Sequence, residues 1–172
     1  LAESLVLACQ KEILSIGALC EVDISLPNYA KQKYEYSDNE QLNNIPTLYE
    51  IAVNTFDAII VISAPYNLYE LKGIDEDKVA LQQEALKPIK QKMMQRSSKE
   101  ELKWVICNFP TESLANAANM SLNEYDKFIS DACFLKKSNP IEQWESLSKD
   151  QSRIIAQLNR GETISFKSDI VD

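Results

Sequence analysis

The 172-residue chain contains no histidine. This absence excludes the imidazole ligands of most zinc sites and the imidazole base that serine and cysteine hydrolases normally use. The four cysteines, Cys9, Cys20, Cys107 and Cys133, show no short paired spacing and lie among apolar neighbours. We expect buried, reduced thiols rather than metal ligands or disulfides. From the residues alone, no catalytic, cofactor-binding or metal-binding residue is assigned.

Positive charge is also scarce, because 18 Lys and Arg face 26 Asp and Glu, for a net charge of -8. A binder of nucleic acid or anionic lipid needs clustered cations. The cations between Lys87 and Arg96 recur at helical spacing, but Glu84 and Glu100–Glu101 flank them, which indicates a solvated helix face. No apolar run approaches the roughly 20 residues of a membrane span, and Glu3 replaces the basic start of a signal peptide. We expect a cytoplasmic protein with no nucleic-acid or membrane partner.

Apolar segments of strand length alternate with amphipathic ones. Leu1–Ile16 has the periodicity of a helix, Gly17 suits its left-handed end, and Ala18–Ser25 alternates like a strand. The continuous apolar runs Asp57–Ser63 and Leu102–Asn108 are typical of parallel strands covered on both faces. This order predicts an α/β fold: a three-layer domain with a mostly parallel sheet flanked by helices.

Three segments separate these expected strands. Asn28–Asn39 carries three tyrosines and is expected to be a loop with its rings packed on the surface, the alternative being a ligand-stacking platform. Glu40–Thr55 is expected to be helical with a break at Pro46, and Asp75–Gln95 to be one long helix.

The stretch from Lys103 to Ile129 is rich in backbone signals. Pro110 cannot donate to a strand ladder, Thr111 can cap a short helix, and Asn119 tolerates a left-handed helix stop. Ser121 and Glu124 form the S-x-x-E capping box of a further helix. We expect a self-consistent scaffold here.

The same stretch, "WVICNFPTESLANAANMSLNEYDKF", resembles the thermophilic metallo-aminopeptidases of the aminopeptidase T and aminopeptidase S type. Their pattern is a W-V strand, Y-P-T, A-x-x-A-G-M-S-x-E-E-Y and a following Phe. The resemblance extends through "EILSIGALCEVDI", "FDAIIVISA", "LKGIDEDKVALQQEALKPI" and "NPIEQWESLSKDQSRIIAQLNRGETI", which is nearly the whole chain. Phe109 and Asn119 depart from the usual Tyr and Gly.

The resemblance implies a metal-dependent aminopeptidase that removes N-terminal residues from peptides. Such enzymes hold two divalent metal ions, such as zinc or cobalt, on Glu, His, Tyr and Asp of a C-terminal catalytic domain. By this analogy residues 1–160 are an N-terminal α/β domain without its first strand, and residues 161–172 begin the connection to the catalytic domain. The chain alone would then be inactive. Its implied partners are that catalytic domain, the peptide substrate and a second copy in a homodimer.

Four residues, Phe109, Pro110, Thr111 and Met120, are expected to border the substrate cavity or the domain interface, because open α/β sheets gather binding loops at this edge. A capped turn with no further role is the competing interpretation.

Two other function classes stay open. A free-standing small-ligand module is weakened by the scattered glycines, and an autonomous carboxylate enzyme by the lack of any distinguished pair. The acidic run Asp75–Asp77 is expected to lie in the first turn of a helix, where its carboxylates interact favourably with the helix dipole.

Overall fold

The computed structural model describes residues 2–166 and 168. The chain divides into two compact units, Leu1–Tyr125 and Asp126–Asp172. The connection expected at residues 161–172 lies partly outside the described residues.

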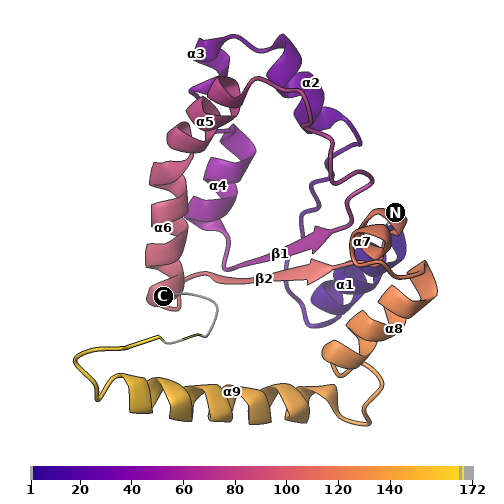
Figure 1. Ribbon diagram of the computed structural model, residues 1–172, viewed down its shortest axis with the longest axis vertical. Coiled ribbons are helices and arrows are strands. Elements are labelled where there is room, and N and C mark those ends of the chain that lie inside the picture. Colours follow the sequence, from indigo (N-terminus) through magenta and orange to yellow (C-terminus); the bar gives the residue numbers. More distant parts are fainter. Residues whose placement is uncertain (1, 167, 169–172) are drawn as a thin grey trace. The chain divides into compact units, whose positions relative to one another are not determined.

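The first unit contains a parallel sheet of two strands, β1 (Ala58–Ser63) and β2 (Lys103–Asn108). Their register runs from Ala58 opposite Lys103 to Ser63 opposite Asn108, so both strands end at the same edge (Figure 1). Parallel neighbours need a crossover connection, which helices α5 (Glu76–Ala85) and α6 (Lys87–Ser98) supply. The predicted fold class, α/β with a parallel sheet flanked by helices, is confirmed.

Six further helices begin in this unit. They are α1 (Glu3–Ser15), α2 (Tyr29–Tyr36), α3 (Asn39–Leu42), α4 (Thr47–Thr55), α7 (Glu112–Ala117) and α8 (Leu122–Ala132). The expected stop after α1 is confirmed, because Gly17 has a left-handed φ of 80° and Ala18 N–H donates to the Ile13 carbonyl. The expected break near Pro46 separates α3 from α4.

Several expectations about this unit are wrong. Ala18–Ser25 forms no strand, and Leu19 is 96% exposed. Alternating apolar and polar residues suit the two faces of a strand, but a strand also needs a neighbouring strand to pair with its backbone N–H and C=O groups. Ala18–Ser25 has no such neighbour within the described residues. The segment expected to be a loop is mostly helix α2, and the long helix is divided into α5 and α6. The strands are not covered on both faces, since Ile106 is 58% exposed.

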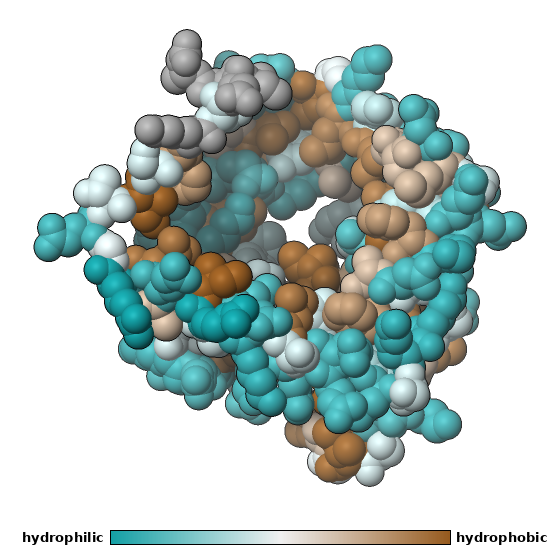
Figure 2. Space-filling view, turned by 60° about the horizontal axis from the view of Figure 1, so that its bottom comes forward, coloured by the Kyte–Doolittle hydropathy of each residue, from teal (hydrophilic) through white to brown (hydrophobic). Residues whose placement is uncertain are grey.

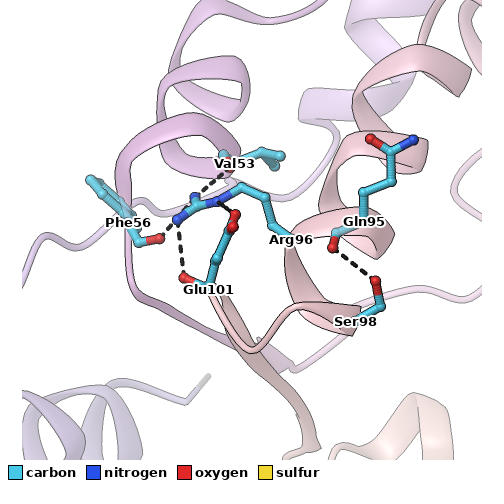
Figure 3. Close-up of polar contacts among 6 residues, drawn as sticks. All are labelled: Val53, Phe56, Gln95, Arg96, Ser98 and Glu101. Carbon is cyan, nitrogen blue, oxygen red and sulfur yellow. Dashed lines mark hydrogen bonds and ion pairs between the residues drawn. The ribbon is translucent and has the colours of Figure 1, made fainter.

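The buried side chains of the first unit are spread over several helices and the start of β2. Leu42, Val53 and Leu102 are its largest fully buried side chains. Arg96 on α6 donates hydrogen bonds to the carbonyls of Val53, Phe56 and Glu101 at 2.8, 3.1 and 3.0 Å (Figure 3). These bonds join the end of α4, the start of β1, the end of α6 and the start of β2.

The second unit contains the end of α8 and the 19-residue helix α9 (Pro140–Leu158). Asn139 caps α9 by accepting from the Glu142 N–H at 3.2 Å. Phe134 and Trp144 meet edge to face with ring centroids 5.5 Å apart. Figure 2 shows hydrophobic side chains next to hydrophilic ones on the molecular surface. Among the described residues, no helix is both long and apolar enough to cross a membrane.

Candidate functional site at the carboxyl ends of the strands

The carboxyl edge of the sheet is where two of the four predicted site residues lie. Phe109 directly follows β2, and its N–H donates to the Ser63 carbonyl at the end of β1 at 2.9 Å. Pro110 then ends the ladder because it has no N–H to donate. Both side chains are half-buried. The chain therefore leaves the sheet at a point fixed by backbone bonding and by proline.

Thr111 and Met120, the other two predicted residues, lie at the two ends of α7. Thr111 is only 5% exposed, and its Oγ1 accepts the Leu114 N–H at 3.3 Å, which confirms the expected N-cap. The Met120 N–H donates to the Ala115 carbonyl at 2.9 Å and ends the helix. The structure thus holds all four residues in one capped segment between β2 and α8. Whether they border a cavity stays a prediction.

The exit from this segment also follows the sequence signals. Asn119 has the expected left-handed φ of 55°. The predicted capping box is formed: Glu124 N–H donates to Ser121 Oγ at 3.3 Å, and Ser121 N–H donates to Glu124 Oε2 at 2.8 Å. The side-chain hydrogen bond from Ser121 is the main cause that lowers the pKa of Glu124. The carboxylate is exposed, so this is a local contribution to the start of α8.

A second loop lies against the segment, and no sequence pattern predicted it. The Leu68 N–H, in the loop after β1, donates to Ser113 Oγ on α7 at 3.1 Å. The two residues are 45 positions apart in the chain. Only the parallel pairing of β1 with β2 brings the two loops to one edge. A single serine among polar residues carries no pattern that predicts such a contact.

The described residues do not fit the two-metal site of an aminopeptidase. The chain has no histidine, and in the part that the structure describes no three His, Cys, Asp or Glu residues lie close enough to hold a metal ion. The acidic run at the start of α5 has a structural role, because Asp75 Oδ1 accepts the Asp77 N–H at 2.9 Å as an N-cap. Its carboxylates complement the helix dipole, as the sequence indicated.

The second unit contains a shallow cavity of about 210 Å³ among Asp131, Phe134, Lys136 and Lys137. None of the predicted site residues lines it. Asp131 accepts a bond from Lys127 at 3.0 Å, which is the main cause that lowers its pKa. Lys136 lies 3.7 Å from the same carboxylate. These groups are well exposed, so the cluster is a set of surface ion pairs worth little in stability.

Comparison with known proteins gives one family. The family model described as thermophilic metalloprotease (M29) matches residues 1–172. The chain therefore belongs to the thermophilic metalloprotease family M29, which confirms the resemblance read from the sequence. A search of curated proteins finds no match.

Proposed function

We propose that this chain is the N-terminal, non-catalytic domain of a metal-dependent aminopeptidase, and that the catalytic domain follows it. The observation that carries the proposal is the family match over residues 1–172 of a chain that has no histidine. A metalloprotease uses its ions to polarise the scissile carbonyl and to generate hydroxide near neutral pH. The described residues offer no cluster for such ions. In this proposal the two divalent ions, such as zinc or cobalt, belong to the catalytic domain.

In this proposal residues 1–160 are the N-terminal domain and residues 161–172 lead to the catalytic domain. The domain helps to enclose the active site, and the intact enzyme acts on peptides in the cytoplasm as a homodimer. Neither nucleic acid nor membrane is a partner, in keeping with the net charge of -8. The segment from Phe109 to Met120 borders the substrate cavity or the interface with the catalytic domain.

Hydrolysis of a leucyl anilide tests the proposal. The purified 172-residue chain should release no leucine above a buffer blank, with or without added zinc or cobalt, because it can assemble neither a metal-bound hydroxide nor an imidazole base. The same chain joined to the proposed catalytic domain should be active. Metal-stimulated release by the short chain that survives repurification would refute the proposal and favour an autonomous enzyme.

The role of the capped segment needs a separate experiment in the intact enzyme. Replacing Pro110 and Thr111 with alanine should lower turnover per folded molecule, in addition to the stability lost with the Thr111 cap, if the segment positions a cavity wall. Thr111→Ser, which keeps the capping oxygen, is the matched control. Lost stability with normal turnover per folded molecule would reduce the segment to a scaffold.

A further inference from the structure

A methionine sulfur joins two helices of the first unit. Tyr49 on α4 donates its hydroxyl to Met93 Sδ on α6, with the oxygen and the sulfur 3.8 Å apart. The two residues are 44 positions apart in the chain, and α4 and α6 are in contact. A thioether sulfur is a weak hydrogen-bond acceptor. This contact therefore depends on the sulfur staying in its reduced form.

The same two helices are joined again one turn further along. Arg96 lies three positions after Met93 on α6, and Val53 lies four positions after Tyr49 on α4. Residues three or four positions apart are neighbours on a helix surface. Arg96 donates to the carbonyl of the fully buried Val53 at 2.8 Å (Figure 3). The Tyr49–Met93 contact thus supports the same helix pair that Arg96 joins.

The three methionines of the chain differ in their surroundings. Met93 is half-buried, Met94 is 52% exposed, and Met120 is half-buried at the end of α7. The exposed part of Met93 leaves a path for a small oxidant such as hydrogen peroxide. An oxygen added to the exposed Met94 would meet water, whereas one added to Met93 enters the contact between α4 and α6. Oxidation of Met93 therefore has a structural consequence that oxidation of its neighbour lacks.

We propose that Met93 is a reversible oxidation site whose sulfoxide weakens the contact between α4 and α6. A sulfur lone pair attacks one oxygen of hydrogen peroxide and the O–O bond breaks. The proton of the transferred oxygen passes to the departing hydroxide to give water, so the sulfur is oxidised by two electrons and the peroxide is reduced. This inference does not rest on the proposed function.

The sulfoxide disturbs the contact whichever lone pair reacts. An oxygen on the Tyr49 side must displace the phenol ring, because a 3.8 Å contact leaves no room for another atom. An oxygen on the other side leaves an electron-poor sulfur that no longer accepts from the hydroxyl. Both epimers also replace a flexible apolar side chain with a polar one at a packed position.

The test is to oxidise the 172-residue chain with hydrogen peroxide, locate the sulfoxides by peptide mass spectrometry and follow urea unfolding by circular dichroism. Sulfoxide at Met93 should raise the equilibrium constant for unfolding about fivefold, the worth of one hydrogen bond. Methionine sulfoxide reductases A and B together should restore the original value, since each enzyme reduces one epimer. Met94→Leu should respond to peroxide as the wild type does.

Met93→Leu is the matched control, because it keeps the apolar volume, the four cysteines and the other two methionines. Peroxide should leave its unfolding unchanged. Tyr49→Phe lacks only the hydroxyl, so oxidation should change its unfolding less than that of the wild type. Equal losses of stability in Met93→Leu and the wild type would refute the inference. It would also be refuted if a chain fully oxidised at Met93 unfolded at the original urea concentration.

Discussion

Replacing Arg96 with methionine should loosen the junction at the start of both strands. The side chain is 16% exposed and donates to three backbone carbonyls from segments about 40 residues apart in sequence. Hydrogen bonds to charged groups contribute about 1.5–3 kcal/mol each when water cannot replace them. Val53 is fully buried, so its carbonyl would lose its partner without compensation. The other two bonds are exposed, and water can take much of their place.

Arg96→Met should therefore lower the free energy of unfolding by about 3 kcal/mol. The methionine keeps the apolar stem, so the loss reports the hydrogen bonds and the 3.7 Å ion pair of Arg96 with Glu101 rather than packing. Arg96→Lys can restore one bond and should recover about half. For a unit of 125 residues the methionine variant should lower Tm by roughly 10 °C.

Urea unfolding followed by circular dichroism measures these losses. The matched control is Lys87→Met, which removes one cation from the same helix at a side chain that is 62% exposed and paired with Glu84. An exposed pair of this kind should contribute less than about 1 kcal/mol. If Arg96→Met unfolds at the same urea concentration as Lys87→Met, the role assigned to Arg96 is wrong.

Four further substitutions test local features. Gly17→Ala should cost about 1 kcal/mol of stability through its φ of 80° alone, since nothing lies within 4 Å of the added Cβ. Gly161→Ala, at a residue with an ordinary φ, should cost little. Equal effects of the two substitutions in urea unfolding would contradict this. Ser121→Ala should remove an N-cap worth about 1 kcal/mol, measured in the same way. The pKa of Glu124 is lowered from 4.5, so its contribution is present above that pH and disappears as pH falls through the lowered pKa. The stability difference between wild type and Glu124→Ala should therefore shrink only below about pH 4.5, and a difference that stays constant in acid would refute this. Thr111→Ala should cost about 1–2 kcal/mol because the cap is buried, and Thr111→Ser much less.

Local signals in the sequence predicted the local structure well. Gly17, Asn119 and the Ser121–Glu124 box do in the structure what their residue types indicate, because each acts on backbone within a few residues. The two apolar strands were also predicted, since short continuous runs of apolar, β-branched residues between helices are typical of strands. The same signals placed Phe109 and Pro110 directly after β2, at the carboxyl edge of the sheet, while their role in a site stays a prediction.

Features that depend on distant parts of the chain were not predicted. The alternation of Ala18–Ser25 could not show that no partner strand lies beside it. The polar composition of Asn28–Asn39 hid helix α2, whose end is fixed by Lys78 donating to the Tyr34 and Ser37 carbonyls. The Leu68 to Ser113 hydrogen bond likewise joins loops that only the sheet brings together. Each of these depends on contacts over about 40 residues or more, which no local pattern records.

Metal stoichiometry tests the central claim most directly. The purified chain should be dialysed against zinc, repurified and measured by inductively coupled plasma mass spectrometry, beside the same chain joined to the proposed catalytic domain. A non-catalytic domain without histidine should retain well below one ion per chain, while the longer protein should retain about two. Stoichiometric zinc on the short chain, lost on chelation together with leucyl anilide hydrolysis, would contradict the account.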